Sequence, residues 1–312
     1  MILQAKKKPR VPVHGVLLLD KPVAWSSNDA LIKAKRLLNA LKAGHTGTLD
    51  PFATGLLPLC FGEATKFSQD LLEADKTYQT VVHLGVATTT GDTEGEVLAT
   101  LPVISTDINE EAIRAVLLQF IGDIMQVPPM YSALKRDGKP LYEYARAGIT
   151  LEREARRVTI HLLEFVSYTA PFLTLNVRCS KGTYIRVLGE DIGKALGCGA
   201  HLNALRRTHV GHLLVENTVT LDALIAMDEE QRASLLAPVD ALLSSFPAIN
   251  LSDELSRRFL QGQRLALGKE DVILPEQIGR VRVYQASSGQ LLGSAQFQEY
   301  AILAPERLIS TA

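Results

Sequence analysis

The chain has 312 residues, 46% of them hydrophobic, and a formal net charge of −1; this length suits one large domain followed by a smaller one. Its three cysteines, Cys60, Cys179 and Cys198, are widely spaced, which argues against a disulfide framework or a zinc site and favours a reduced, cytoplasmic protein. No signal-peptide core follows the basic N-terminus, and no apolar run approaches the ~18 residues that span a bilayer.

Charge is distributed unevenly along the chain. Residues 1–10 and 33–42 each hold four basic residues and no acidic one, and residues 178–209 hold six basic against two acidic residues. Residues 221–256 show the reverse, with seven acidic residues and one basic. The small net charge therefore argues neither for nor against a polyanionic partner, and each cluster by itself is most simply a solvated surface.

The N-terminal third predicts two helices separated by a glycine-containing loop. Residues 26–43 have apolar side chains at helical spacing, with Ser27 or Asn28 as the N-cap and a glycine at the end. A second amphipathic run covers residues 63–75. Asp50 would then lie in the loop between the two helices.

The next segments predict strands, one helix and a long loop. Residues 76–90 are rich in Thr and Val and predict a strand, and residues 91–100 supply a turn and a returning strand. Residues 107–123 predict an amphipathic helix that begins at Asp107. Residues 126–150 combine paired prolines, glycines, tyrosines and basic residues, which indicates a long functional loop or a short helical excursion.

The C-terminal half continues as strands and helices and predicts an α+β fold. Residues 156–168 and 172–180 predict a hairpin that turns at Ala170 and Pro171, and residues 181–200 begin as a strand and become helical near Val187. A further strand, a short helix and a polar linker follow. The last 65 residues contain a hairpin with Ser288 and Gly289 at its turn, which predicts a small β-rich module.

The segment GHTGTLDPFATGLLPLCFGEATKF, residues 44–67, carries the first candidate for chemistry, Asp50. An Asp-Pro pair commonly caps a turn or helix. Alternatively, Gly44, Gly47 and Gly55 allow a ligand to approach the backbone closely, so the loop would hold one rigid acid. With a reference pKa of about 3.9, this carboxylate is ready to act as a nucleophile or a base.

Four other side chains each have a structural and a functional interpretation. His45 is a satisfied polar residue, a general base, or a plug for a displaced base. Tyr78 is a core residue or a platform on which a base stacks. Tyr184 and Arg186 are two apart on a predicted strand end, so they would leave the same face. Arg186 is then a surface cation or the partner that orients Asp50.

Known catalytic signatures are missing from the sequence, but an ordered set of motifs resembles one family. The sequence has no P-loop, GxSxG or HExxH pattern, and no second carboxylate at a spacing typical of glycosidases. The segments GVLLLDKP, SSND, GHTGTLDPFATGLLPLCFGEATKF, DKTY, YSALK, LYEYAR and SKGTYIR occur in this order. Together they resemble the bacterial tRNA pseudouridine synthase B (TruB) family over about residues 14–220.

The resemblance implies isomerisation of uridine 55 to pseudouridine in the TΨC loop of tRNA, by base flipping and without cofactor or metal. Asp50 would be the catalytic residue and Arg186 its partner. The remaining substrate-binding residues would be His45, Tyr78, Tyr184, Leu205 and Lys66. The implied fold is that of pseudouridine synthases, with a mixed, largely antiparallel central sheet flanked by helices.

The resemblance also implies a domain organisation and a partner. Residues 1–246 would form the catalytic domain, with residues 126–150 as an RNA clamp, and residues 247–312 a small β-rich, PUA-like RNA-binding domain. The partner would be the T-arm of tRNA, bound by a cytoplasmic monomer without protein partners or membrane, and the acidic residues 221–256 would lie away from the site. Two alternatives are a tRNA folding chaperone in which catalysis is incidental and an enzyme guided by partner proteins.

Overall fold

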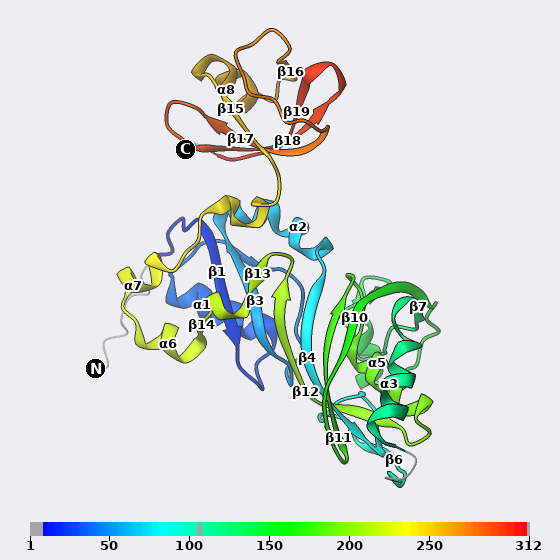
Figure 1. The fold of residues 1–312 in the computed structure, drawn as a ribbon. Coiled ribbons are helices and arrows are strands. Elements are labelled where there is room, and N and C mark those ends of the chain that lie inside the picture. Colours follow the sequence, from blue (N-terminus) through cyan, green and yellow to red (C-terminus); the bar gives the residue numbers. More distant parts are fainter. Residues whose placement is uncertain (1–8, 105–107, 311–312) are drawn as a thin grey trace, which may run out of the picture.

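The larger part of the chain is built on a mixed sheet. The computed structural model describes residues 9–104 and 108–310, so most of the basic segment 1–10 and the predicted helix start Asp107 lie outside the described residues. A ten-stranded sheet runs in the order β14-β1-β3-β12-β4-β11-β10-β7, with β2 paired to β3 and β13 paired to β12 (Figure 1). Its strands are β1 (Gly15–Lys21), β2 (Ala43–His45), β3 (Thr54–Phe61), β4 (Lys76–Leu84), β7 (Gly122–Gln126), β10 (Arg156–Thr169), β11 (Phe172–Cys179), β12 (Ala200–Val210), β13 (Leu213–Leu214) and β14 (Val219–Thr220).

Most neighbouring strands of this sheet are antiparallel, and only β1–β14 and β12–β3 run parallel. The helices that accompany it are α1 (Ser27–Leu37), α2 (Ser68–Glu73), α3 (Glu110–Leu118), α4 (Leu141–Arg146), α5 (Ile185–Ala195), α6 (Leu221–Ala226) and α7 (Glu229–Ser234). Apolar side chains of α1, α3 and α5 form one core with the inner side chains of the sheet. The α+β class with a mixed, largely antiparallel sheet is confirmed.

A second, smaller sheet occupies the C-terminal part of the chain. Its five strands run in the order β15-β17-β18-β19-β16 and enclose a separate core with α8 (Asp253–Leu260). The strands are β15 (Ala248–Leu251), β16 (Leu265–Ala266), β17 (Gly279–Gln285), β18 (Leu291–Gln298) and β19 (Ile302–Leu308). Figure 1 shows this unit beyond one end of the large sheet, next to α2, where Arg280 pairs with Asp70.

Three boundaries differ from the sequence-based expectation. The first helix ends at Leu37, not Ala43, because Asn39 adopts a positive φ and the chain turns into β2. The run TGLLPLCF, predicted as loop, forms the buried strand β3. Asp50 therefore lies between two strands, not between two helices. The helix expected over 107–123 covers only 110–118, with Asn109 as its N-cap.

Residues 126–150 contain both alternatives predicted for them. Most of the segment is loop, but it includes a two-stranded hairpin, β8 (Lys135–Arg136) with β9 (Lys139–Pro140), and the short helix α4. A second small hairpin joins β5 (Val86–Thr88) to β6 (Val97–Thr100). The predicted hairpins at Ala170–Pro171 and at Ser288–Gly289 are both confirmed.

Candidate active site

Asp50 lies in the connection between β2 and β3, and hydrogen bonds hold this connection on both sides of it. Ser27, in the first turn of α1, is 2% exposed; its hydroxyl donates to the Leu49 carbonyl (2.9 Å) and accepts from the Leu49 amide (2.8 Å). The Ala24 amide donates to the Pro51 carbonyl (2.9 Å). The backbone at Asp50 is therefore fixed, which restricts where its carboxylate can point.

Lys21, at the end of β1, supports the same turn from inside the protein. Its side chain is fully buried, and its Nζ donates to the carbonyls of Pro22, Trp25 and Pro51 (2.9, 2.6 and 3.3 Å). Burial lowers the pKa of Lys21 to about 8, while the nearby Asp50 carboxylate acts in the opposite direction. The buried ammonium thus holds the backbone of the loop and contributes positive potential at Asp50.

Asp50 forms an ion pair with Arg186, as the family resemblance implied. The Oδ2 atom of Asp50 lies 3.0 Å from Nε of Arg186, whose side chain is 4% exposed. The remaining guanidinium nitrogens donate to the carbonyls of Thr90 (2.8 Å) and Tyr131 (2.7 Å), and Asp92 Oδ2 lies 3.5 Å from Nη1. The arginine is therefore held from every side, whereas the Asp50 side chain remains 36% exposed.

The electrostatic surroundings of Asp50 act in opposing directions. Burial raises the pKa of its carboxyl above the ordinary value, Arg186 lowers it, and the buried carboxylate of Asp92 raises it again. The net direction is upward. A partly buried carboxylate whose pKa is raised in this way is more basic than a fully exposed aspartate.

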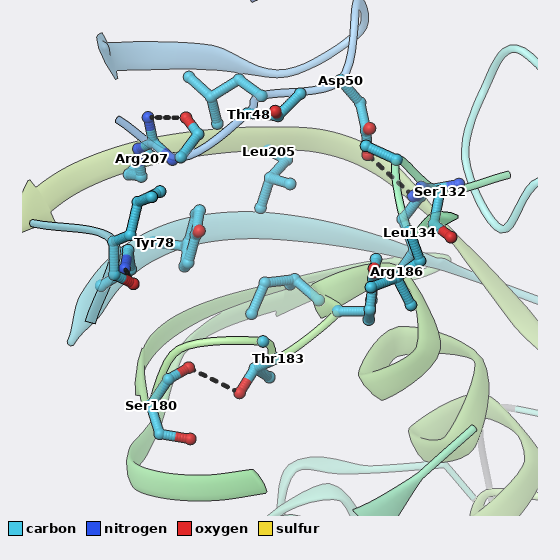
Figure 2. A pocket seen from close by; sticks show the side chains of 18 residues that line it. Thr48, Asp50, Tyr78, Ser132, Leu134, Ser180, Thr183, Arg186, Leu205 and Arg207 are labelled. Carbon is cyan, nitrogen blue, oxygen red and sulfur yellow. Dashed lines mark hydrogen bonds and ion pairs between the residues drawn. The ribbon is translucent and has the colours of Figure 1, made fainter. Parts of the chain in front are cut away.

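The Asp50 carboxylate opens into a cavity of about 350 Å³. Five side chains proposed from the sequence line this cavity: Asp50, Tyr78, Tyr184, Arg186 and Leu205. Figure 2 shows Asp50, Ser132 and Arg186 at one end, Tyr78 and Arg207 at the other, and Leu205 between them. One acid, aromatic rings and an apolar floor are therefore brought together from the β2–β3 connection, β4, α5 and β12.

The backbone relation predicted for Tyr184 and Arg186 is wrong. Tyr184 is the extended N-cap residue of α5, and Arg186 lies in the first turn of that helix, so the two do not share a strand face. The side-chain amide of Gln126 accepts from the Tyr184 amide (3.0 Å) and donates to its carbonyl (3.3 Å). The hydrogen bonds from Gln126 and the start of α5 place both side chains in the cavity, whereas strand alternation does not.

Two predicted substrate-binding residues are not among those that line the cavity. His45 lies in β2, where burial and Arg207 lower its pKa, and its Nδ1 atom has no hydrogen-bond partner among the described residues. Lys66 donates to Glu63 (2.6 Å) and to the carbonyl of Leu308 (2.9 Å). Its contacts therefore join the segment that follows β3 to β19 of the C-terminal sheet.

Arg207 is a residue that the sequence interpretation missed. It is 1% exposed, donates from Nε to the Leu56 carbonyl (2.8 Å) and from Nη2 to the Gly47 carbonyl (3.0 Å), and lines the cavity. Arg206 on the other face of β12 pairs with Asp20. Adjacent residues of a strand point to opposite faces, so the doubled arginine was a usable sign that one of them enters the protein.

Two glycines of the Asp50 loop lie close to Arg207, and one of them, Gly47, also lines the cavity, where the sequence predicts that a ligand approaches the backbone. A Cβ atom at Gly55 would lie 2.3 Å from the Arg207 carbonyl oxygen, and one at Gly47 would lie 3.3 Å from Nη1 of Arg207. Both glycines also have positive φ angles, +101° and +72°. At Gly44, by contrast, a Cβ atom would meet nothing within 4 Å.

The charged surroundings of the cavity agree with part of the expected distribution. None of its lining residues comes from the acidic segment 221–256.

Within the described ranges, no group of three or more His, Cys, Asp and Glu side chains is placed to hold a metal ion. No helix in the described part of the chain is long and apolar enough to cross a membrane.

The chain matches three family models in succession. Residues 35–185 match the N-terminal domain of TruB family pseudouridylate synthases, residues 186–244 match the tRNA pseudouridylate synthase B C-terminal domain, and residues 247–309 match the C-terminal model of pseudouridine synthase II TruB. Curated relatives named tRNA pseudouridine synthase B include one from Ralstonia nicotianae, 63% identical with 98% of this chain and 97% of the relative covered. Another, from Burkholderia mallei, is 64% identical with 97% and 99% covered.

A solved structure titled as the archaeal box H/ACA sRNP Nop10-Cbf5 complex is similar in fold. It is 26% identical, has a TM-score of 0.70, and the match covers 95% of this chain and 86% of that one. The likeness extends over both sheets, since nearly the whole chain is covered. With the family models and the two relatives of high identity, it places the protein: the chain belongs to the TruB family of pseudouridylate synthases.

Proposed function

We propose that this protein converts uridine to pseudouridine in tRNA, at position 55 of the TΨC loop, with Asp50 as the catalytic residue. The observation that carries the proposal is the Asp50–Arg186 pair, whose carboxylate opens into a cavity also lined by Tyr78 and Tyr184. A cavity of about 350 Å³ is within the range of small-ligand sites and suits one flipped base. The names of the curated relatives support the same reaction.

The reaction moves one base within one nucleotide. The N1–C1′ bond breaks, the ring turns, and a C5–C1′ bond forms; C5 then loses its proton and N1 gains one. No outside atom is added, so a single carboxylate at the reacting nucleoside is enough. Tyr78 supplies a ring for base stacking, which recovers part of the cost of extruding the base from the RNA.

The clamp and the C-terminal unit extend the site toward the rest of the tRNA. Residues 126–150 act as the clamp: the Tyr131 carbonyl binds Arg186 directly. Lys135 and Arg136, which form β8, are exposed and suit phosphate contacts. Residues 1–246 form the catalytic domain and residues 247–312 a β-rich, PUA-like RNA-binding domain. Their separate hydrophobic cores support this division.

The protein acts as a monomer in the cytoplasm and needs no protein partner. Cys60, Cys179 and Cys198 are free and buried, which suits a reducing compartment. The purified chain alone should therefore modify a bare T-arm transcript, and light scattering during the reaction should report one chain per particle. A requirement for a second protein would instead favour the guided type of enzyme.

The tRNA folding chaperone is the less favoured function, because the family relatives are named as synthases and the cavity presents a fixed carboxylate. The test compares Asp50→Asn with the control Asp222→Asn, which changes an exposed aspartate of α6. We expect no pseudouridine from Asp50→Asn by mass mapping, while its Kd for the T-arm stays within about threefold, since a group acting in the transition state contributes little to ground-state binding. Asp222→Asn should keep full activity. Full activity in Asp50→Asn would end the proposal.

A further inference from the structure

Two buried cations in the cavity form no ion pair with any carboxylate in the part of the chain that the structure describes. Arg207 is 1% and Lys76 7% exposed, and both line the cavity. Arg207 binds backbone carbonyls, with the Tyr78 phenol as a further partner; Nζ of Lys76 donates to the carbonyls of Leu71, Leu72 and Ala74 (3.1, 2.8 and 2.6 Å). Among the ion pairs of residues 9–104 and 108–310, neither cation takes part.

These two cations lie side by side. A Cβ atom placed on Gly47 would be 3.3 Å from Nη1 of Arg207 and 3.9 Å from Cε of Lys76, so both side chains lie beside the same glycine. Arg207 and Tyr78 are at the end of the cavity away from Asp50 (Figure 2). The cavity thus has the Asp50 carboxylate at one end and, at the other, two cations that form no ion pair among the described residues.

Arg207 and Lys76 differ from Arg186 in their ion pairing, and this difference indicates a functional role for the two unpaired cations. Arg186 lines the same cavity and is compensated by Asp50 and Asp92. Burying a charge without a counter-charge is costly, and carbonyl groups could be bound by neutral donors. Cations kept at such a place suit a substrate that becomes negatively charged there.

We propose that Arg207 and Lys76 stabilise the negative charge that the uracil ring acquires when its N1–C1′ bond breaks; this rests on the proposed function. The electron pair of that bond stays on the ring, spread over N1, O2 and O4, and the electron-deficient C1′ faces Asp50. The ring then turns and uses the electrons at C5 to form the C5–C1′ bond. C5 releases its proton, N1 takes up one, and neither cation gains or loses a proton.

An RNA phosphate is the other anion that could occupy this end of the cavity. The depth of both cations favours the ring, because they are almost completely covered and share the cavity with the stacking residue Tyr78. An RNA phosphate and the ring anion would have different effects on RNA binding and on the reaction rate. A phosphate contact strengthens RNA binding and adds to its salt dependence, whereas stabilisation of the ring anion raises the rate of the chemical step alone.

The first experiment measures single-turnover pseudouridine formation and T-arm Kd at two salt concentrations. We expect Arg207→Met to slow the chemical step by about 10²–10³-fold, as loss of a preorganised charge partner does elsewhere, and to leave Kd and its salt slope unchanged. Lys76→Met should slow it in the same way, and Arg207→Lys should restore part of the rate. The control is Arg206→Met, which removes the neighbouring arginine that pairs with Asp20 on the other face of β12.

The second experiment separates charge stabilisation from a structural role by changing the leaving base. With 5-fluorouridine at the target position, the fluorine itself stabilises the ring anion, so the loss of the original nucleoside should be slowed less by Arg207→Met than with uridine. Equal slowing of both substrates, a wild-type rate in Arg207→Met and Lys76→Met, or a weaker Kd with a reduced salt slope would overturn the proposal. If Arg207→Met does not fold, judged by circular dichroism, Lys76→Met decides. A wild-type protein that forms no pseudouridine would instead overturn the proposed function.

Discussion

Replacement of Ser27 by alanine tests how the position of Asp50 is maintained. The Ser27 hydroxyl makes two hydrogen bonds to the backbone of Leu49, of 2.9 and 2.8 Å, at a site where the side chain is 2% exposed. Its removal leaves a buried amide and a buried carbonyl without partners. At about 1–2 kcal/mol for each group, we expect the free energy of unfolding to fall by about 2–4 kcal/mol.

Ser27→Ala should also lower the single-turnover rate of pseudouridine formation, because Leu49 adjoins Asp50 in the chain. The assay is urea unfolding followed by the fluorescence of Trp25, the single tryptophan, which packs on the main core two residues before Ser27. The control is Ser26→Ala, which removes the N-cap of α1. It should lower the free energy of unfolding by about 1 kcal/mol and leave the rate of pseudouridine formation unchanged. A Ser27→Ala protein with wild-type stability and wild-type single-turnover rate would refute the reasoning.

Three further predictions concern individual contacts. Lys66→Ala should keep the wild-type rate, because Lys66 contacts Glu63 and Leu308, and should lower the free energy of unfolding by less than about 1 kcal/mol; a large loss of rate in a kinetic assay would place it in the site. Asp92→Asn removes a buried counter-charge of Arg186 and should lower that free energy by about 1–3 kcal/mol in urea unfolding, with no loss as the contrary result. Because burial raises the pKa of Asp50, its ionised form is lost at a higher pH than for an exposed aspartate, so the rate should fall on acidification with a midpoint above the pKa of an exposed aspartate. That limb should persist in His45→Gln, and its disappearance there would assign it to the histidine. The same raised pKa means that ionisation of Asp50 lowers stability as the pH rises through this range, a decrease that Asp50→Asn should lack.

Local features of the chain were predictable wherever the controlling interaction is itself local. The turns at Ala170–Pro171 and Ser288–Gly289 connect observed hairpins, because turn residues act on their own backbone. The acid and its partner, Asp50 and Arg186, were identified through motifs, and their ion pair is present. By contrast, TGLLPLCF was missed as a strand, since a short apolar run has no periodicity that separates it from other buried elements.

The sequence alone determined the α+β class, most of the strands and helices, and the Asp50–Arg186 pair, because these follow from periodicity, turn chemistry and an ordered set of motifs. Only the tertiary structure decided which distant residues meet. It places Arg207 of β12 against Gly47 and Leu56, and it directs Lys66 to Leu308, 242 residues away. The physical reason is that neither a charge buried without an ion-pair partner nor a hydrogen bond between residues far apart in the chain leaves a local pattern in the sequence.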